Sequence, residues 1–405
     1  DAPQPPTTPP MTLRSALFAW SVLMTSTLAG AAAAAPSTAA ASTELLIGCY
    51  TGPNCKGIGR YRFDPAQGRI GAEPLEVIAT DNPSWITFSP DGATLYAVNE
   101  NGPKSADPVG RASSFALARG AAASRRLSQA NSLGDDPAHA SASADGKYLF
   151  VANYSGNASP GGTLAVLPVD GEGRLQPAVQ SLTHRASQAD RERQLSPHVH
   201  AVVSSRDGGY VYAADLGADK VYGYRYDPAR SAERPLLAAP TPYLELPPGT
   251  GPRHLLFDAD GRHAYLTLEM SGEVVVLDYQ DGRLSIAQTV ALDPGRASGN
   301  AAAALHLSAD GRFLYASNRG EDNHIAVYAV DAGNGRLSAV QRRATEGRGP
   351  REFALSPDGR FVVVANQHSN TLVVIERDTR SGKLGKTVQT VAMQSPSDVK
   401  FAPGR

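Results

Sequence analysis

Basic residues are not in excess in this chain, because 38 lysines and arginines stand against 39 aspartates and glutamates, a formal net charge of -1. Proteins that bind nucleic acid or anionic membranes need a basic surface, so neither is expected as the main partner. Long segments with helical periodicity are lacking after residue 40, and no G-x-S-x-G motif occurs. The 39 glycines and 30 prolines instead indicate a globular chain rich in turns, without the serine nucleophile of an α/β-hydrolase.

Cysteine is also scarce, with only Cys49 and Cys55 in the stretch GCYTGPNCKG. Two lone cysteines are too few for a structural metal site. If Cys49 ends one strand and Cys55 begins the next, the two side chains face each other across a tight turn. An exported protein would allow them to form a disulfide.

Residues 1–43 are typical of a secretory leader and not of a folded domain. Residues 1–10 are proline-rich and precede Met11, the expected initiator; Arg14, an apolar run at 16–28 and the small-residue tract AGAAAAAPS follow. This is the order of regions in a signal peptide, and the apolar run is too short for a typical membrane span. We expect cleavage near residues 33–35, a linker to about residue 43, and a periplasmic or secreted protein free of the membrane. An uncleaved anchor or a disordered tail is the alternative.

An Asp-Gly turn between two apolar strands recurs along the rest of the chain. Its aspartates are Asp91, Asp145, Asp207, Asp260, Asp310 and Asp358. Successive turns lie roughly 50 residues apart, and each is followed by another apolar run and a further short strand. Four strands in a unit of this length are typical of a β-propeller blade, so repeat architecture replaces the two or three domains that length alone would suggest.

The two ends of the chain supply a seventh unit. PSDVKFAPGR at the C-terminus reads as the opening strand of a blade, and TELLIGCYT and GIGRYRFD near the N-terminus supply the strands that should follow it. An open ring would leave an apolar face exposed to water. We therefore predict an all-β, seven-bladed propeller of four-stranded blades over residues 44–405, with the last blade closed by both ends. A six- or eight-bladed ring and an open solenoid are the alternatives.

Several stretches resemble the lactonase family with a seven-bladed propeller, which includes bacterial 6-phosphogluconolactonases and fungal carboxymuconate cyclases. They include SPHVHAVVSSRDGGYVYAADLGADKVYGY, GTGPRHLLFDADGRHAYLTLEMSGEVVVLDY and LHLSADGRFLYASNRGEDNHIAVYAVD, and the likeness extends over residues 44–403. The resemblance implies a lactonase or a cyclase and points to four residues as catalytic. These are His200, Arg253, Glu269 and Arg319.

The repeat alignment points to the same four residues, which come from three successive blades. They stand seven residues before or nine residues after the Asp-Gly aspartate, and the hairpin brings both positions to one end of the blade, around one mouth of the central channel. A lactone hydrolase needs a base to activate water and a cation near the developing oxyanion. His200 or Glu269 can be the base, while Arg253 and Arg319 stabilise the oxyanion or hold an anionic substituent.

Further residues form a second set around the same mouth. Secondary substrate-binding candidates are His198, Arg351, His139 and Glu100, with Glu352 and Asp398 as further candidates. His198 and His200 are two residues apart, so a strand would place both imidazoles on one face, as a metal pair could, but no third ligand is evident, and no metal or other cofactor is expected. His254 is expected to face the packing between blades, and the charged segment 181–196 is interpreted as solvated.

Three functions remain open. The first is a hydrolase that opens a sugar lactone, of the 6-phosphogluconolactonase kind, although export favours an unphosphorylated lactone as the small-molecule substrate. The second is a muconate-type cyclase in which the arginines hold carboxylates. The third is a non-enzymatic periplasmic propeller that binds a ligand or protein, which would not need the four charged residues at one mouth. A monomer is expected in each case.

Overall fold

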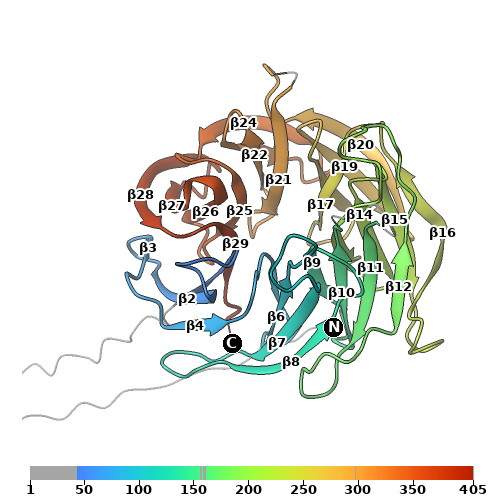
Figure 1. Cartoon of the computed structure of the whole chain (residues 1–405). Coiled ribbons are helices and arrows are strands. Elements are labelled where there is room, and N and C mark those ends of the chain that lie inside the picture. The colour runs from blue at the N-terminus through green and yellow to red at the C-terminus, as the bar shows by residue number, and fades with distance from the viewer. Residues whose placement is uncertain (1–42, 156, 158–160, 297, 405) are drawn as a thin grey trace, which may run out of the picture. The chain divides into compact units, whose positions relative to one another are not determined.

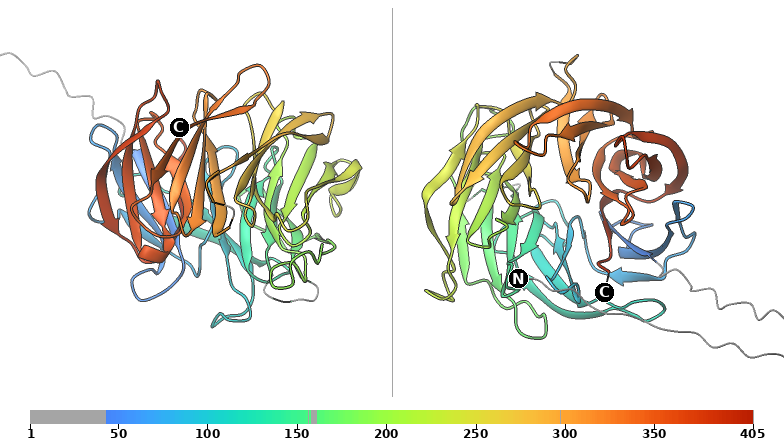
Figure 2. Two further views of the ribbon diagram at one scale, coloured as in Figure 1. Left: turned by 90° about the horizontal axis from the view of Figure 1, so that it is seen from above. Right: turned by 180° about the vertical axis from the view of Figure 1, so that it is seen from behind.

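The computed structural model describes residues 43–155, 157, 161–296 and 298–404, so the predicted leader, residues 1–43, lies outside the described residues except for its last residue. Its strands form seven antiparallel sheets arranged around a common centre (Figures 1 and 2). Each innermost strand contacts the innermost strands of both neighbouring sheets, including the pair that closes the ring. The predicted seven-bladed propeller is therefore confirmed. None of the helices in this part of the chain has the length and hydropathy needed to cross a membrane.

The strands of each blade follow one another in sequence from the innermost to the outermost position. Blade 1 comprises β5 (Ile86–Phe88), β6 (Thr94–Asn99), β7 (Arg111–Ala116) and β8 (Arg125–Asn131). Blade 2 comprises β9 (Pro137–Ala142), β10 (Tyr148–Asn153), β11 (Thr163–Pro168) and β12 (Gln180–Thr183). Blade 3 comprises β13 (Val199–Ser204), β14 (Tyr210–Asp215), β15 (Lys220–Tyr226) and β16 (Leu236–Glu245). Blade 4 comprises β17 (Pro252–Phe257), β18 (His263–Leu268), β19 (Glu273–Gln280) and β20 (Arg283–Ala291).

The remaining blades follow the same order, and the last joins both ends of the chain. Blade 5 comprises β21 (Asn300–Leu307), β22 (Phe313–Gly320), β23 (His324–Val330) and β24 (Leu337–Ala344). Blade 6 comprises β25 (Pro350–Leu355), β26 (Phe361–Asn366), the short 3₁₀ helix η1 (Gln367–Ser369), β27 (Thr371–Arg377) and β28 (Leu384–Ala392). Blade 7 comprises β29 (Pro396–Phe401), β1 (Thr43–Cys49), β2 (Gly57–Asp64), β3 (Arg69–Ile70) and β4 (Glu76–Ala79). In blade 7 the outer position is shared, because β3 and β4 both pair with β2.

The repeated turn between the two inner strands explains why Asp-Gly recurs. In blade 1 the hydroxyl of Ser89 donates to Asp91 Oδ1 at 2.6 Å, and the amide of Ala93 donates to the same oxygen at 3.0 Å. Gly92 has φ of 70°, a conformation that costs glycine little because it has no Cβ. The aspartate therefore belongs to hairpin chemistry and is not part of a site.

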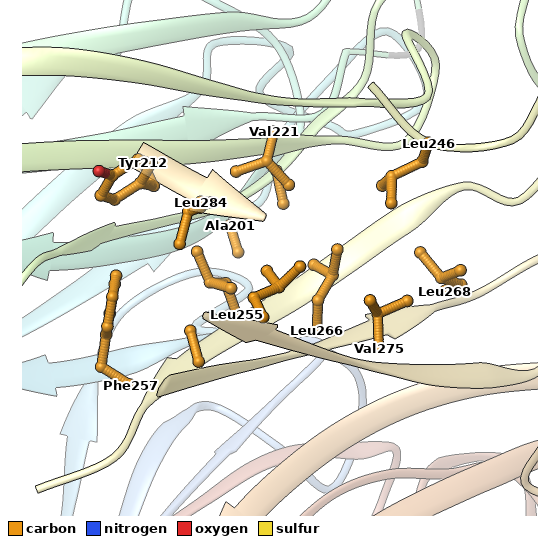
Figure 3. Packing of buried hydrophobic residues seen from close by; sticks show 13 residues of the cluster. Ala201, Tyr212, Val221, Leu246, Leu255, Phe257, Leu266, Leu268, Val275 and Leu284 are labelled. Carbon is orange, nitrogen blue, oxygen red and sulfur yellow. The ribbon is translucent and has the colours of Figure 1, made fainter. Parts of the chain in front are cut away.

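The core lies between the blades. Alternate residues of each strand point to opposite faces of its sheet, so each blade buries apolar side chains against both neighbours. Figure 3 shows one such layer, in which Tyr212 and Val221 of blade 3 pack with Leu255, Leu266 and Val275 of blade 4.

The ring closes as the sequence predicts. β1 pairs with β29 in an antiparallel ladder that places Leu45 opposite Phe401. The ring of Phe63 on β2 then packs against Phe401 at 5.1 Å and against Phe361 of blade 6 at 6.1 Å between centroids. Cys49 and Cys55 form the expected disulfide at the end of β1.

Candidate active site

A β-bulge at the start of the innermost strands shapes the mouth of the channel. The ladder between the two inner strands skips one or two residues at the same place in six blades. The skipped residues are Ala138, His200, Arg253 with His254, Ala303 with Ala304, Arg351, and Ser397. A bulge interrupts the alternation of side chains and redirects the extra residue. The position seven residues before the turn aspartate is thus the bulge itself, which explains why it carries chemistry in some blades and small residues in others.

Glu269 is the centre of the charged cluster. Its Oε2 lies 3.0 Å from Arg253 Nε and 2.9 Å from Arg319 Nη2, and its Oε1 lies 2.7 Å from Arg193 Nη2. Glu269 is 7% exposed and Arg253 only 1% exposed. Burial by itself would raise the pKa of the Glu269 carboxyl, but Arg319 and Arg253 hold it well below its usual range. The carboxylate is therefore charged and fully engaged by the arginines.

His200 lies buried beside this cluster. Its ring meets Tyr154 edge-on, with 5.6 Å between centroids, and His254 in the same way at 5.3 Å. Burial and the charge of Arg253 lower the pKa of His200 well below that of a free imidazole. Its Nδ1 has no hydrogen-bond partner among the described residues. His200 is consequently a neutral imidazole with one unused nitrogen next to three arginines.

A second acid extends the site toward blades 1, 6 and 7. Glu100 accepts a hydrogen bond from the Tyr50 hydroxyl at 2.9 Å and lies 3.6 Å from Arg351 Nη2. The Arg351 guanidinium also lies over the Tyr50 ring, 5.5 Å from its centroid. Burial raises the pKa of Glu100, although Arg351 opposes the effect. The secondary candidates Glu100 and Arg351 therefore form a pair of their own at the mouth.

His198 and His200 do not form a metal pair. The ring of His198 stacks on Tyr154 with 4.4 Å between centroids, and its Nδ1 donates to the Tyr154 carbonyl at 2.8 Å. The bulge at His200 breaks the alternation on which the shared-face expectation rested. No group of three or more His, Cys, Asp or Glu side chains in the described ranges is placed to hold a metal ion.

The expectation that His254 faces the packing between blades is wrong. Its ring lies 5.2 Å from Trp85 and 5.6 Å from His139, in addition to its contact with His200. The cause is again the bulge, which skips Arg253 and His254 together and turns both toward the channel. His139 stacks on Trp85 at 4.1 Å, and burial lowers its pKa to about 3. These aromatic rings form a neutral layer next to His200.

Glu352 and Asp398 belong to a separate charged network on blades 5 to 7. Glu352 Oε1 lies 2.6 Å from His306 Nε2, and Lys400 pairs with Asp398. Burial would raise the pKa of Glu352, but His306 and Lys400 lower it, whereas burial raises the pKa of Asp398. Each carboxylate therefore has a partner other than the arginines around Glu269, His306 for Glu352 and Lys400 for Asp398.

Arg193 belongs to the charged cluster around Glu269, although the sequence pattern does not single it out. It lies in the segment 181–196, which the sequence predicts to be solvated, yet its Nη2 also contacts the Tyr154 hydroxyl at 3.2 Å. Gln194 holds the segment in place, because its Nε2 donates to the Leu216 carbonyl at 2.8 Å and to Asp219 at 2.7 Å. The place of Arg193 in the sequence could have indicated this contact. The segment is rich in arginine and directly precedes the strand that carries His200, and that strand begins at the channel mouth.

The chain matches the family model described as "Lactonase, 7-bladed beta-propeller" over residues 44–401. It is 31% identical over 358 residues to a 6-phosphogluconolactonase of Bacillus subtilis (strain 168), covering 88% of this chain and 97% of that protein. A 6-phosphogluconolactonase of Formosa agariphila is 30% identical over 359 residues, covering 88% and 99% respectively. The solved structure of the periplasmic gluconolactonase of Pseudomonas aeruginosa is similar with a TM-score of 0.86 and 53% identity, covering 89% of this chain and 99% of that chain. The chain thus belongs to the lactonase family of seven-bladed β-propellers.

Proposed function

We propose that this protein is a hydrolase that opens a sugar lactone at the channel mouth formed by His200, Arg253, Glu269 and Arg319. One observation carries the proposal: a buried carboxylate, three guanidinium groups and a neutral imidazole converge there. Lactonases and gluconolactonases among the relatives support the same activity. A binding scaffold would have no use for this expensive concentration of buried charge.

His200 is the better general base of the two candidates. Glu269 is already paired with three arginines, and its low pKa makes it a poor proton acceptor. His200 is neutral and has a free Nδ1. Negative charge that develops on the lactone carbonyl oxygen offsets the field of Arg253, so the basicity of His200 rises in the transition state, when it is needed.

The reaction then needs no covalent nucleophile. Water attacks the lactone carbonyl carbon while His200 accepts its proton, and Arg253 and Arg319 stabilise the oxyanion. When the tetrahedral intermediate collapses, the ring C–O bond breaks and the leaving oxygen takes the proton from the imidazolium to become a hydroxyl. Glu269 keeps the two guanidinium groups in place and limits their mutual repulsion.

Export is part of the proposal. The leader-like residues 1–43, the disulfide between Cys49 and Cys55, and the likeness to a periplasmic gluconolactonase all support a propeller, residues 44–405, that acts outside the cytoplasm. An unphosphorylated aldonolactone or another lactone suits that location. The muconate-type cyclase uses the same arginines on a dicarboxylate, and the test below includes it.

Lactone hydrolysis by the purified protein, followed in a pH-stat, tests the activity and the base together. We expect His200→Ala to lower kcat/KM by on the order of 10² to 10⁴, whereas the remote exposed Arg380→Gln leaves it unchanged. Because His200 must be neutral and its pKa is depressed, the wild-type rate should hold as the pH falls through 6.5 and decline only below. Full activity of the His200→Ala protein would remove the histidine from the mechanism. Turnover of a muconate but of no lactone would replace the hydrolase with the cyclase.

A further inference from the structure

A hollow adjoins the charged cluster on the side of blades 5 and 6. It has a volume of about 390 Å³, begins at Glu269 and Arg319 and continues between the two blades. Its remaining wall is made by Ala301, Gly320, Asn323, Arg348, Gly349 and His368. Arg319 lines both the catalytic cluster and this hollow, so a substrate can reach from one into the other.

The cations of the hollow are not balanced by acids. Of the two arginines on the wall, Arg319 is paired with Glu269, but Arg348 forms no ion pair with a carboxylate in the described part of the chain. Among the described residues that line the hollow, Glu269 is the single acid, and three arginines already engage it. The wall therefore carries a surplus of positive charge that an anion would neutralise.

The side chains of Arg348 and His368 are carried by two segments that are hydrogen-bonded to each other. The His368 amide donates to the Arg348 carbonyl at 3.0 Å, the Gln367 amide donates to the Gly349 carbonyl at 2.9 Å, and the Ser369 hydroxyl accepts from the Arg348 amide at 3.0 Å. Gly349 has φ of 71°, and a Cβ there would lie 2.3 Å from His368 Cδ2. Because Gly349 has no side chain, the His368 ring can lie against the backbone of Gly349. Arg348 is the residue directly before this glycine, so the imidazole and the guanidinium are carried by neighbouring backbone.

We propose that this hollow is a subsite for an anionic substituent of the lactone, a phosphate or a carboxylate at the end of the sugar away from the scissile ester, bound by Arg348 and His368 with Arg319. The inference rests on the proposed lactonase function and names the residues that select its substrates. Guanidinium groups bind both oxyanions in a bidentate manner, and a protonated imidazole adds a charge-assisted hydrogen bond.

Because His368 titrates, binding of an anion in the subsite should depend on pH. Burial and the charges of Arg319, Arg351 and Arg348 lower the pKa of His368 in the free protein. Glu269, the acid on the same wall, is occupied by its arginines. A bound anion favours the imidazolium and therefore raises the pKa. Preference for an anionic lactone should accordingly increase as the pH falls toward the pKa of His368.

Matched substrates test the subsite independently of the chemistry. The substrates are glucono-1,5-lactone, its 6-phosphate, and the corresponding lactone with a carboxylate at C6. We expect Arg348→Gln and His368→Asn each to lower the ratio of kcat/KM for an anionic lactone to that for the neutral one by about tenfold. Arg380→Gln, a substitution of an exposed residue remote from the hollow, serves as the control. His368→Asn should also abolish the pH dependence of the ratio measured with the carboxylate substrate. If the ratio falls for the phosphorylated lactone, the subsite binds a phosphate, and if it falls for the lactone with a C6 carboxylate, the subsite binds a carboxylate.

If neither variant changed the ratio of kcat/KM for anionic and neutral lactones, the subsite would be overturned. Arg348 and His368 would then be solvated surface residues, and the proposed lactonase function would still stand. If the wild type hydrolysed none of the three lactones, the proposed function would fail by itself. The subsite would then be decided by proton NMR of His368 in the presence of inorganic phosphate or acetate. A raised pKa with either anion supports an anion site, and no change with both overturns it.

Discussion

Glu269→Gln removes the negative charge that holds the arginine cluster together. The variant keeps the size of the side chain and one acceptor oxygen, but Arg253 and Arg319, at 3.0 and 2.9 Å from Oε2, lose their counter-charge. Removing one partner of a buried ion pair costs about 3 to 5 kcal/mol. The retained amide places the expected loss of unfolding free energy near the lower limit, about 3 kcal/mol. The contact with Arg193 adds little, since that side chain is 43% exposed.

The pH dependence of this loss follows from the depressed pKa of Glu269. A carboxyl whose pKa is lowered by folding contributes stability above its unfolded pKa, about 4.3 for glutamate, and loses the contribution as the pH falls toward the folded pKa. The difference between wild type and Glu269→Gln should therefore be complete at pH 7 and pH 5.5 and shrink below about pH 4. Loss of order among the guanidinium groups should also lower kcat/KM by on the order of 10².

Denaturant titrations followed by the fluorescence of Trp85 measure the effect directly, because that indole stacks on His139 in the layer next to the site. Glu376→Gln is the matched control, since Glu376 pairs with Lys386 at 3.5 Å on the surface and should contribute less than about 0.5 kcal/mol. A loss for Glu269→Gln as small as that of the control at pH 7 would refute the role of Glu269 as counter-charge. So would a difference that persists in full at pH 3.5.

Three further predictions concern the same mouth. Arg253→Lys should lower kcat by on the order of 10² on neutral and anionic lactones alike, because the buried guanidinium serves the oxyanion; a loss confined to anionic lactones would assign it to the substituent instead. Arg193→Gln should lower kcat/KM by no more than about fivefold, with the effect diminished at high salt, since its pair with Glu269 is half exposed; a salt-independent loss would argue for a direct catalytic contact. Replacing Cys49 and Cys55 by serine should lower the free energy of unfolding by about 2 kcal/mol, the value for a short closed loop, as measured by denaturation; an unchanged midpoint would contradict a stabilising disulfide.

Much of the candidate site could be predicted from the alignment of repeats. The positions seven before and nine after the turn aspartate are brought together by the hairpin, so Arg253 and Glu269 had to share one end of blade 4. Their contact with Arg319 of blade 5 follows from ring closure. What strand alternation could not predict is the bulge, because a skipped residue leaves no mark in the apolar pattern. Strand alternation therefore predicts the wrong orientations for His254 and His198.

By itself the sequence determined the architecture of this protein. Six copies of a strand, an Asp-Gly turn and a strand specify blades, and the complementary fragments at 43–64 and 396–401 specify how the ring closes. Each of these features is local, depending on turn chemistry and on a period of two residues. Only the tertiary structure decided which charges meet. Arg193 reaches Glu269 from an insertion before blade 3, and Arg348 and His368 border the hollow from two segments of blade 6. Contacts of this kind depend on the bulges and on the curvature of the closed ring, which no single repeat contains.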